Sequence, residues 1–114
     1  MKILLLFSLI LTTGLMANDK EIQHLLSYVK NTECKYIRNG SSHNGHKAVK
    51  HIQRKYDYFK DDIKTTEDFI RLSATKSTMS SSPYYIECKN KQKVESSKWL
   101  LEELVRFRQL QQKI

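Results

Sequence analysis

The residues of this sequence best suited to binding chemistry surround a predicted tight turn. Arg38 precedes Asn39 and a glycine, and His43 follows three residues after that glycine. Ser80 and Ser81 lie in a later hydroxyl-rich segment. If the two segments meet, their side chains would form a pocket for a small anion, because arginine holds such groups through paired N–H donors. The alternative is a structural turn in which Arg38 makes a salt bridge.

Three histidines, at positions 43, 46 and 51, are candidates for metal binding or acid–base chemistry. Secreted clusters of this kind can hold zinc or copper. His46 and His51 are five residues apart, however, so they do not share one face of a helix. We therefore expect separate loop and surface histidines, with no metal and no cofactor. The enzymatic alternative is a small hydrolase or transferase that combines one of these histidines with a loop serine.

Other patterns that resemble catalytic motifs carry little weight. Ser73 and Lys76 fit the Ser-x-x-Lys motif of penicillin-binding enzymes, but the companion Ser-Asp-Asn and Lys-Thr-Gly elements are missing. Neighbouring acids such as Asp61 and Asp62 cannot form a glycosidase pair, which needs two carboxyl groups facing each other across a cleft. The sequence also lacks a glycine-rich phosphate loop and a dinucleotide-binding fingerprint. We leave open whether the protein is an enzyme and favour a binding function.

The beginning of the chain predicts export. Lys2 is followed by an apolar run to Leu11, and Ala17 is a small residue suited to the position before a cleavage site. Residues 1–17 are therefore expected to be a signal peptide, and residues 18–114 a single small domain. The alternative is an uncleaved anchor, but a spanning helix needs about 20 apolar residues. We expect a periplasmic protein with no stable membrane anchor after cleavage.

Two cysteines, Cys34 and Cys88, are present in the expected mature chain. In an oxidising compartment such a pair is more often a disulfide than a metal or redox site. A catalytic cysteine is the alternative, although no patterned histidine accompanies either residue. We expect one disulfide that stabilises the small domain.

The charge of the expected mature domain indicates attraction to anions. Without Lys2 it holds 19 basic and 12 acidic residues, a net charge of +7. Such a domain is drawn to anionic surfaces, although a positive charge also serves solubility alone. We expect an unidentified protein or an anionic envelope component as partner, and no nucleic acid.

Apolar residues at helical spacing predict four helices. They cover Asp19 to Lys30, His46 to Phe59, about Thr65 to Ala74, and a last segment that begins near Ser96. A capping box is expected at the start of the third helix. The outer face of the second helix is expected to hold Lys47, Lys50, Arg54 and Lys55. The buried stripe of the last helix is expected to hold Trp99, Leu100, Leu104, Val105, Phe107 and Leu110, with Glu102, Glu103, Arg106 and Arg108 outside.

Two short strands, at residues 35–38 and 84–88, complete the predicted elements. Each adjoins a cysteine, so an antiparallel pairing would place Cys34 and Cys88 side by side. The pattern predicts an α+β fold. It comprises about four helices and a small two-stranded antiparallel sheet, in a single domain held by one disulfide.

Several of these segments together carry a resemblance. They are Tyr36-Ile37-Arg38-Asn39-Gly40-x-x-His43, Ala48-Val49-x-His51-Ile52, Lys55, Ile63-x-Thr65-x-Glu67-x-Phe69-Ile70 and Pro83-Tyr84-x-Ile86. In them the chain resembles the YfeK-like family of small uncharacterised proteobacterial periplasmic proteins, a domain of unknown function. Family members often have glycine where this chain has Ser81. The resemblance implies a signal peptide and a periplasmic location, and it implies no activity.

The sequence therefore favours a non-enzymatic binding or interaction domain for an envelope component or a protein partner. The small hydrolase or transferase remains one alternative. A second is an immunity or inhibitor protein that blocks a secreted toxin. A histidine within hydrogen-bond reach of a serine in a cleft would favour the enzyme, whereas an exposed patch would favour the binding domain.

Overall fold

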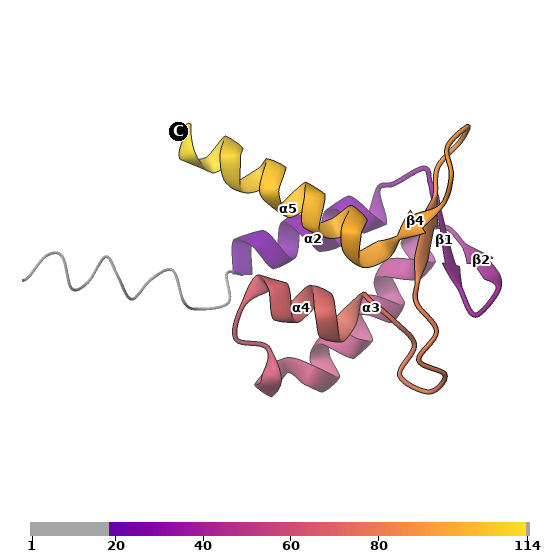
Figure 1. Cartoon of the computed structure of the whole chain (residues 1–114). Coiled ribbons are helices and arrows are strands. Elements are labelled where there is room, and N and C mark those ends of the chain that lie inside the picture. The colour runs from indigo at the N-terminus through magenta and orange to yellow at the C-terminus, as the bar shows by residue number, and fades with distance from the viewer. Residues whose placement is uncertain (1–18, 114) are drawn as a thin grey trace, which may run out of the picture.

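The computed structural model describes residues 19–113, so the predicted signal peptide and its cleavage site lie outside the described residues. The helices are interrupted by two pairs of consecutive strands. They are, in order, α2 Asp19–Lys30, β1 Lys35–Arg38, β2 Ser41–His43, α3 Gly45–Phe59, a 3-10 turn Lys60–Asp62, α4 Thr66–Ser73, β3 Tyr85–Glu87, β4 Val94–Glu95 and α5 Ser96–Gln112. Figure 1 shows the helices gathered on one side and the sheet with its hairpins on the other. The predicted α+β class and its four α-helices are confirmed for this part of the chain.

The sheet is antiparallel and has the strand order β2-β1-β3-β4. The predicted pairing of the two cysteine-bearing strands forms its centre, with Ile37 opposite Tyr85. Two short outer strands enlarge the sheet beyond the predicted pair. β2 arises because Asn39 and Gly40 both have positive φ, 51° and 77°, which closes a two-residue hairpin after β1. The sequence of β2 has no apolar alternation, so the pattern did not predict it.

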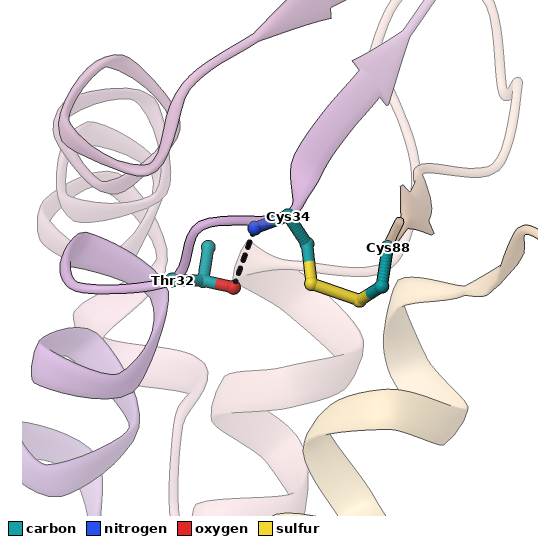
Figure 2. The surroundings of a disulfide bond; sticks show 3 residues. All are labelled: Thr32, Cys34 and Cys88. Atoms are coloured by element: carbon teal, nitrogen blue, oxygen red, sulfur yellow. Dashed lines mark hydrogen bonds between the residues drawn. A yellow bond between two sulfur atoms is a disulfide. The ribbon is translucent and has the colours of Figure 1, made fainter. Parts of the chain in front are cut away.

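The predicted disulfide is present and joins the two central strands. Cys34 and Cys88 lie 4.3 Å apart between their Cα atoms, just before β1 and just after β3 (Figure 2). The backbone N–H of Cys34 also donates a hydrogen bond of 3.1 Å to the hydroxyl of Thr32. The register that places Lys35 opposite Glu87 brings the cysteines together one residue further on. Closing a loop of 54 residues stabilises the fold by ~4 kcal/mol in the chain-entropy model.

The helical core follows the predicted apolar spacing in α2, α3 and α4. The buried residues are Ile22, Leu25, Leu26 and Val29 from α2, Ala48, Ile52 and Tyr56 from α3, and Phe69 and Ile70 from α4. The capping box at Thr65 is formed as predicted, with Asp68 as the reciprocal partner. Tyr36, Tyr84 and Ile86 extend this core onto one face of the sheet.

Gly45 fixes how α3 begins. A Cβ at this position would lie 2.2 Å from the carbonyl oxygen of Val29, so only glycine permits this approach of α3 to the end of α2. The Asn44 side chain caps the helix by accepting a hydrogen bond of 2.9 Å from the Lys47 backbone. The close contact between the start of α3 and the end of α2 therefore requires glycine at position 45.

The buried stripe of α5 differs from the prediction. Leu100 and Leu104 are buried as expected, but Val105 is 54% exposed and Glu103 only 5%. Leu100, Glu103, Leu104 and Phe107 follow the i, i+3, i+4, i+7 spacing of one face, whereas Val105 lies off that face. Leu110 is also exposed. The prediction had assigned residues to the buried face because they are apolar, whereas their position on the helix determines which of them are buried.

Glu103 is buried because it has polar partners there. Its carboxylate lies 2.7 Å from the His24 ring nitrogen and 2.6 Å from Arg106. The His24 ring also stacks on Phe107 with centroids 4.1 Å apart. His24, expected to be an ordinary helix residue, thus helps to join α2 to α5.

Candidate functional site

A small cavity lies where β1 and β2 face α3. Its volume is about 50 Å³, and its walls combine basic, aromatic and aliphatic side chains. The lining residues are Tyr36, Arg38, His43, Lys47, Ala48, His51, Ile52, Arg54 and Tyr84. Because one water needs about 10–15 Å³ of such volume, the cavity has room for a group of a few heavy atoms, such as a carboxylate or a phosphate.

Regular secondary structure aims the polar side chains into this cavity. Arg38 lies two residues from buried Tyr36 on β1, and alternate residues of a strand project from the same face. His43 on β2 lies directly opposite Tyr36 on β1, so the side chains of these two residues share one face of the sheet. Lys47 and His51 are one turn apart on α3 and share a face of that helix. The strands β1 and β2 therefore form one side of the site, and α3 forms the other.

The basic residues of the cavity are not neutralised by acids. Arg38, Lys47 and Arg54 contribute three positive charges, and no aspartate or glutamate lines the cavity. Within residues 19–113 none of these three side chains forms a salt bridge. The salt bridge that the structural alternative assigned to Arg38 is therefore absent from this part of the chain. Like charges held together without a counter-ion attract an anion.

Tyr84 and His51 form the inner wall. Tyr84 is 1% exposed, and its hydroxyl lies 3.1 Å from Nε2 of His51. Lys55 Nζ also approaches this hydroxyl at 3.4 Å and donates a hydrogen bond of 2.5 Å to the carbonyl of Lys76. Burial, with the nearby charges of Arg38, Lys55 and Arg54, lowers the pKa of His51 to about 4. The ring is therefore neutral at neutral pH.

His43 presents an unsatisfied polar atom. Its Nε2 is buried and has no hydrogen-bond partner. Burial, together with Lys47 and Arg38, lowers the pKa of this imidazole below its usual value. An orphaned buried nitrogen beside a cavity costs free energy unless a ligand or a water satisfies it.

The residues predicted to form one site separate into two places. Arg38 and His43 line the cavity, whereas Asn39 and Ser80 lie in a shallow depression that includes neither of them. There the Ser80 hydroxyl donates a hydrogen bond of 2.8 Å to the side-chain carbonyl of Asn39. Ser81 is exposed and has a φ of 60°, the left-handed region that glycine favours. Arg38 is the last residue of β1, whereas Asn39 is the first residue of the left-handed turn, with a φ of 51°, so the two neighbours belong to different backbone conformations.

Sequence reasoning did not identify the α3 side of the cavity. Lys47 and Arg54 had been assigned to an outer, solvated face, and both are indeed exposed, but they also line the cavity. Their spacing with His51, at i, i+4 and i+7, was the available signal, since it places all three on one stripe. The sequence pattern did not indicate that β1 packs against this face of α3.

The other chemical candidates are dispersed. Ser73 of the Ser-x-x-Lys segment is fully buried, and its hydroxyl has no partner. Across residues 19–113 no hydrogen bond joins a histidine to a serine side chain, and no group of three potential metal ligands occurs. A helix long and apolar enough to cross a membrane is likewise absent from that part of the chain.

The fold and the cavity define a small disulfide-bonded α+β domain with a basic pocket. The chain belongs to a family of unknown function (DUF5329), whose model matches residues 16–108. No curated protein and no solved structure matches the chain at a significant level. The arrangement of the site must therefore carry the functional argument.

Proposed function

We propose that this chain is an exported, non-enzymatic binding domain that holds an anionic group of an envelope component or a protein partner. One observation carries the proposal. Arg38, Lys47 and Arg54 surround a single cavity and lack carboxylate partners within residues 19–113. Keeping three cations close together without a partner costs free energy, so the arrangement favours occupation by an anion.

The chemistry of the cavity suits a compact oxyanion. An arginine supplies paired N–H donors for a carboxylate or phosphate, and lysine supplies a point charge. Tyr36 and Tyr84, both buried, line the cavity with aromatic surface. A low local dielectric strengthens the attraction between the basic groups and a bound anion.

Two features of the chain support a periplasmic location. The apolar run before Ala17 supports export, and the disulfide supports an oxidising compartment. Membership of the finer YfeK-like group is part of the same proposal. Intact-mass analysis of the exported protein should show a chain that begins at Asn18, and retention of residues 1–17 would contradict the export step.

A titration with methylphosphonate tests the binding proposal directly. The mature domain should bind this small oxyanion with heat release or shifts of the His43 and His51 ring resonances. The double variant Lys47→Gln/Arg54→Gln should bind at least tenfold more weakly, because it removes two of the three charges. Lys89→Gln, which removes one positive charge, is the control, since Lys89 lies on the β3–β4 hairpin outside the cavity. Absence of binding to the unaltered domain would overturn the proposal.

The nature of the natural partner is a separate question. Affinity capture from the periplasm with cross-linking should retain an anionic envelope component or a protein in a manner that depends on Arg38. A captured toxin would support the inhibitor role. Turnover of a captured molecule would favour the hydrolase or transferase and contradict the non-enzymatic part of the proposal.

A further inference from the structure

A second basic surface adjoins the cavity on the other side of α3. It is an open groove of about 700 Å³ between α2 and α3, lined by Gln23, Leu26, Ser27, Lys30, Val49, Lys50, Gln53 and Arg54. Like the cavity, the groove has no aspartate or glutamate in its lining. The Gln53 amide donates a hydrogen bond of 3.1 Å to Asp57 one turn further on, so an acidic residue bounds the groove at that end.

Arg54 belongs to both the cavity and the groove. At 100° per residue, Lys47, Lys50 and Arg54 fall within an arc of about 60° on α3. They form a basic ridge, with the cavity on one side and the groove on the other. The two sites are therefore continuous along positively charged surface.

The groove combines charge with apolar surface. Lys30 and Lys50 are exposed and form no salt bridge within the described residues 19–113. Val49 is partly exposed and adds apolar surface to the groove, whereas Leu26 is only 6% exposed. Lys30 also suits the C-terminal end of α2 through the helix dipole, whereas Lys50 in the middle of α3 has no such role. Lys50 is therefore the more informative residue of the two.

We infer that the ligand carries two phosphate-type groups joined by an uncharged spacer, with one group in the cavity and the second across Arg54 at Lys30 and Lys50. This inference rests on the proposed function, since it extends the same site. Charge complementarity favours an anion in the groove, and the partly exposed Val49 favours a spacer that has hydrocarbon character. Arg54 contacts both phosphate-type groups.

The geometry sets the length of that spacer. The two groups lie on neighbouring sides of one helix and share Arg54, so their separation is shorter than a helix diameter of about 10 Å. When one phosphate-type group occupies the cavity, the second binds in an intramolecular step. The resulting gain in affinity is largest when the spacer matches the span between the sites.

A series of alkane diphosphonates of increasing chain length measures this span. Methylene diphosphonate is too short to reach the groove and should bind about as tightly as methylphosphonate. A longer member should bind at least tenfold more tightly, with an optimum at an intermediate length. The double variant Lys30→Gln/Lys50→Gln should lose this gain and keep its affinity for methylphosphonate, whereas Lys89→Gln should keep both. Thermal melting of each variant establishes that it is folded.

The outcomes separate the two proposals. If methylphosphonate binds but spacer length brings no gain, the second site is wrong and the proposed function stands. If no phosphonate binds, the proposed function itself is wrong. A gain that survives in Lys30→Gln/Lys50→Gln, or that falls equally in Lys89→Gln, would show general charge attraction and contradict the assignment of the groove.

Discussion

Arg108 and Arg38 are two arginines of this domain with opposite surroundings. Arg108 on α5 donates hydrogen bonds of 2.8 Å to Glu21 of α2 and to Glu67 of α4. Arg38 on β1 faces a cavity with Lys47 and has no carboxylate partner within residues 19–113. The first arginine joins three helices, whereas the second leaves its charge available. The comparison distinguishes an arginine that stabilises a fold from one that can recognise a ligand.

The two regions also differ in how burial is compensated. Around Arg108 the pKa values of Glu21 and Glu67 are lowered, chiefly by the hydrogen bonds from its guanidinium. Around Arg38 the pKa of His51 is lowered by burial and by positive neighbours. Each ionised group of the helical cluster has an opposite charge, and the cavity has charges of one sign. Of these two regions, it is the cavity that would gain from an external anion.

Removal of the disulfide should produce the largest change, because it joins β1 of the cavity wall to β3. Cys34→Ser/Cys88→Ser should lower the free energy of unfolding by ~4 kcal/mol, measured by denaturant titration. Hydrogen exchange in the variant should show β1 opening together with the cavity. A loss of under about 1 kcal/mol would show that packing alone positions the sheet.

Arg108→Ala should destabilise the helical region without affecting the cavity. The side chain of Glu21 is 12% exposed and would lose its partner, while that of Arg108 is 38% exposed, which reduces the effect through solvent screening. We expect a loss of about 1–2 kcal/mol with unchanged affinity for methylphosphonate.

Arg71→Ala is the matched control for the helical region. Its pairing with Asp68 is an exposed i, i+3 contact, with the Arg71 side chain 65% exposed, so its removal should cost less than about 0.5 kcal/mol. Equal losses in Arg71→Ala and Arg108→Ala would contradict the structural role given to Arg108.

The pH dependence of stability should differ between the regions. The pKa of His51 is about 4 in the folded domain, below its ordinary value of 6.5. The unfolded chain therefore takes up a proton first, and stability falls as the pH decreases from 6.5 to 4. The pKa values of Glu21 and Glu67 are also lowered, so their contribution is present above 4.5 and is lost as the pH falls below it.

Two variants assign these pH ranges. His51→Gln should flatten the dependence of the free energy of unfolding between pH 6.5 and 4, although His43, whose pKa is also lowered, contributes in the same direction. Arg108→Ala should reduce the dependence below pH 4.5. An unchanged profile for His51→Gln would mean that His51 is not the neutral buried group of the cavity.

Ser80→Ala should have the smallest effect and tests where the site ends. It removes two exposed hydrogen bonds of the hydroxyl, the one of 2.8 Å donated to Asn39 and the one of 3.3 Å accepted from the Ser82 backbone, which should cost less than about 0.5 kcal/mol. Since the depression around Ser80 is separate from the cavity, the affinity for methylphosphonate should not change. A tenfold loss of affinity would instead show that Ser80 and Arg38 belong to the same binding site.

Local patterns were sufficient to predict much of the fold. The spacing of Ile22, Leu25, Leu26 and Val29 gave the limits of α2, and the two cysteines gave the pairing of β1 with β3. β2 and β4 are defined by backbone hydrogen bonds to neighbouring strands, which leave little trace in three or two residues. Such short outer strands lie beyond what periodicity can indicate.

The candidate site was only half predictable for a similar reason. Arg38 and His43 stood out beside the Asn-Gly turn, but Lys47 and Arg54 look like solvated helix residues until the sheet is placed against α3. Local proximity also misled, since Asn39 is next to Arg38 in sequence and faces elsewhere. A binding site assembled from three elements depends on tertiary packing, which the pattern of one element does not contain.

The most direct test of the account compares the affinity and the melting temperature of Arg38→Ala. We expect methylphosphonate affinity to fall tenfold or more, the scale of one charge-assisted hydrogen bond, while the melting temperature stays within about 2–4 °C. The affinity of Arg38→Lys for methylphosphonate should lie between those of Arg38→Ala and the unaltered domain, because lysine keeps the charge and loses the paired donors. An Arg38→Ala domain that melts much earlier and binds methylphosphonate unchanged would show that Arg38, like Arg108, serves the fold.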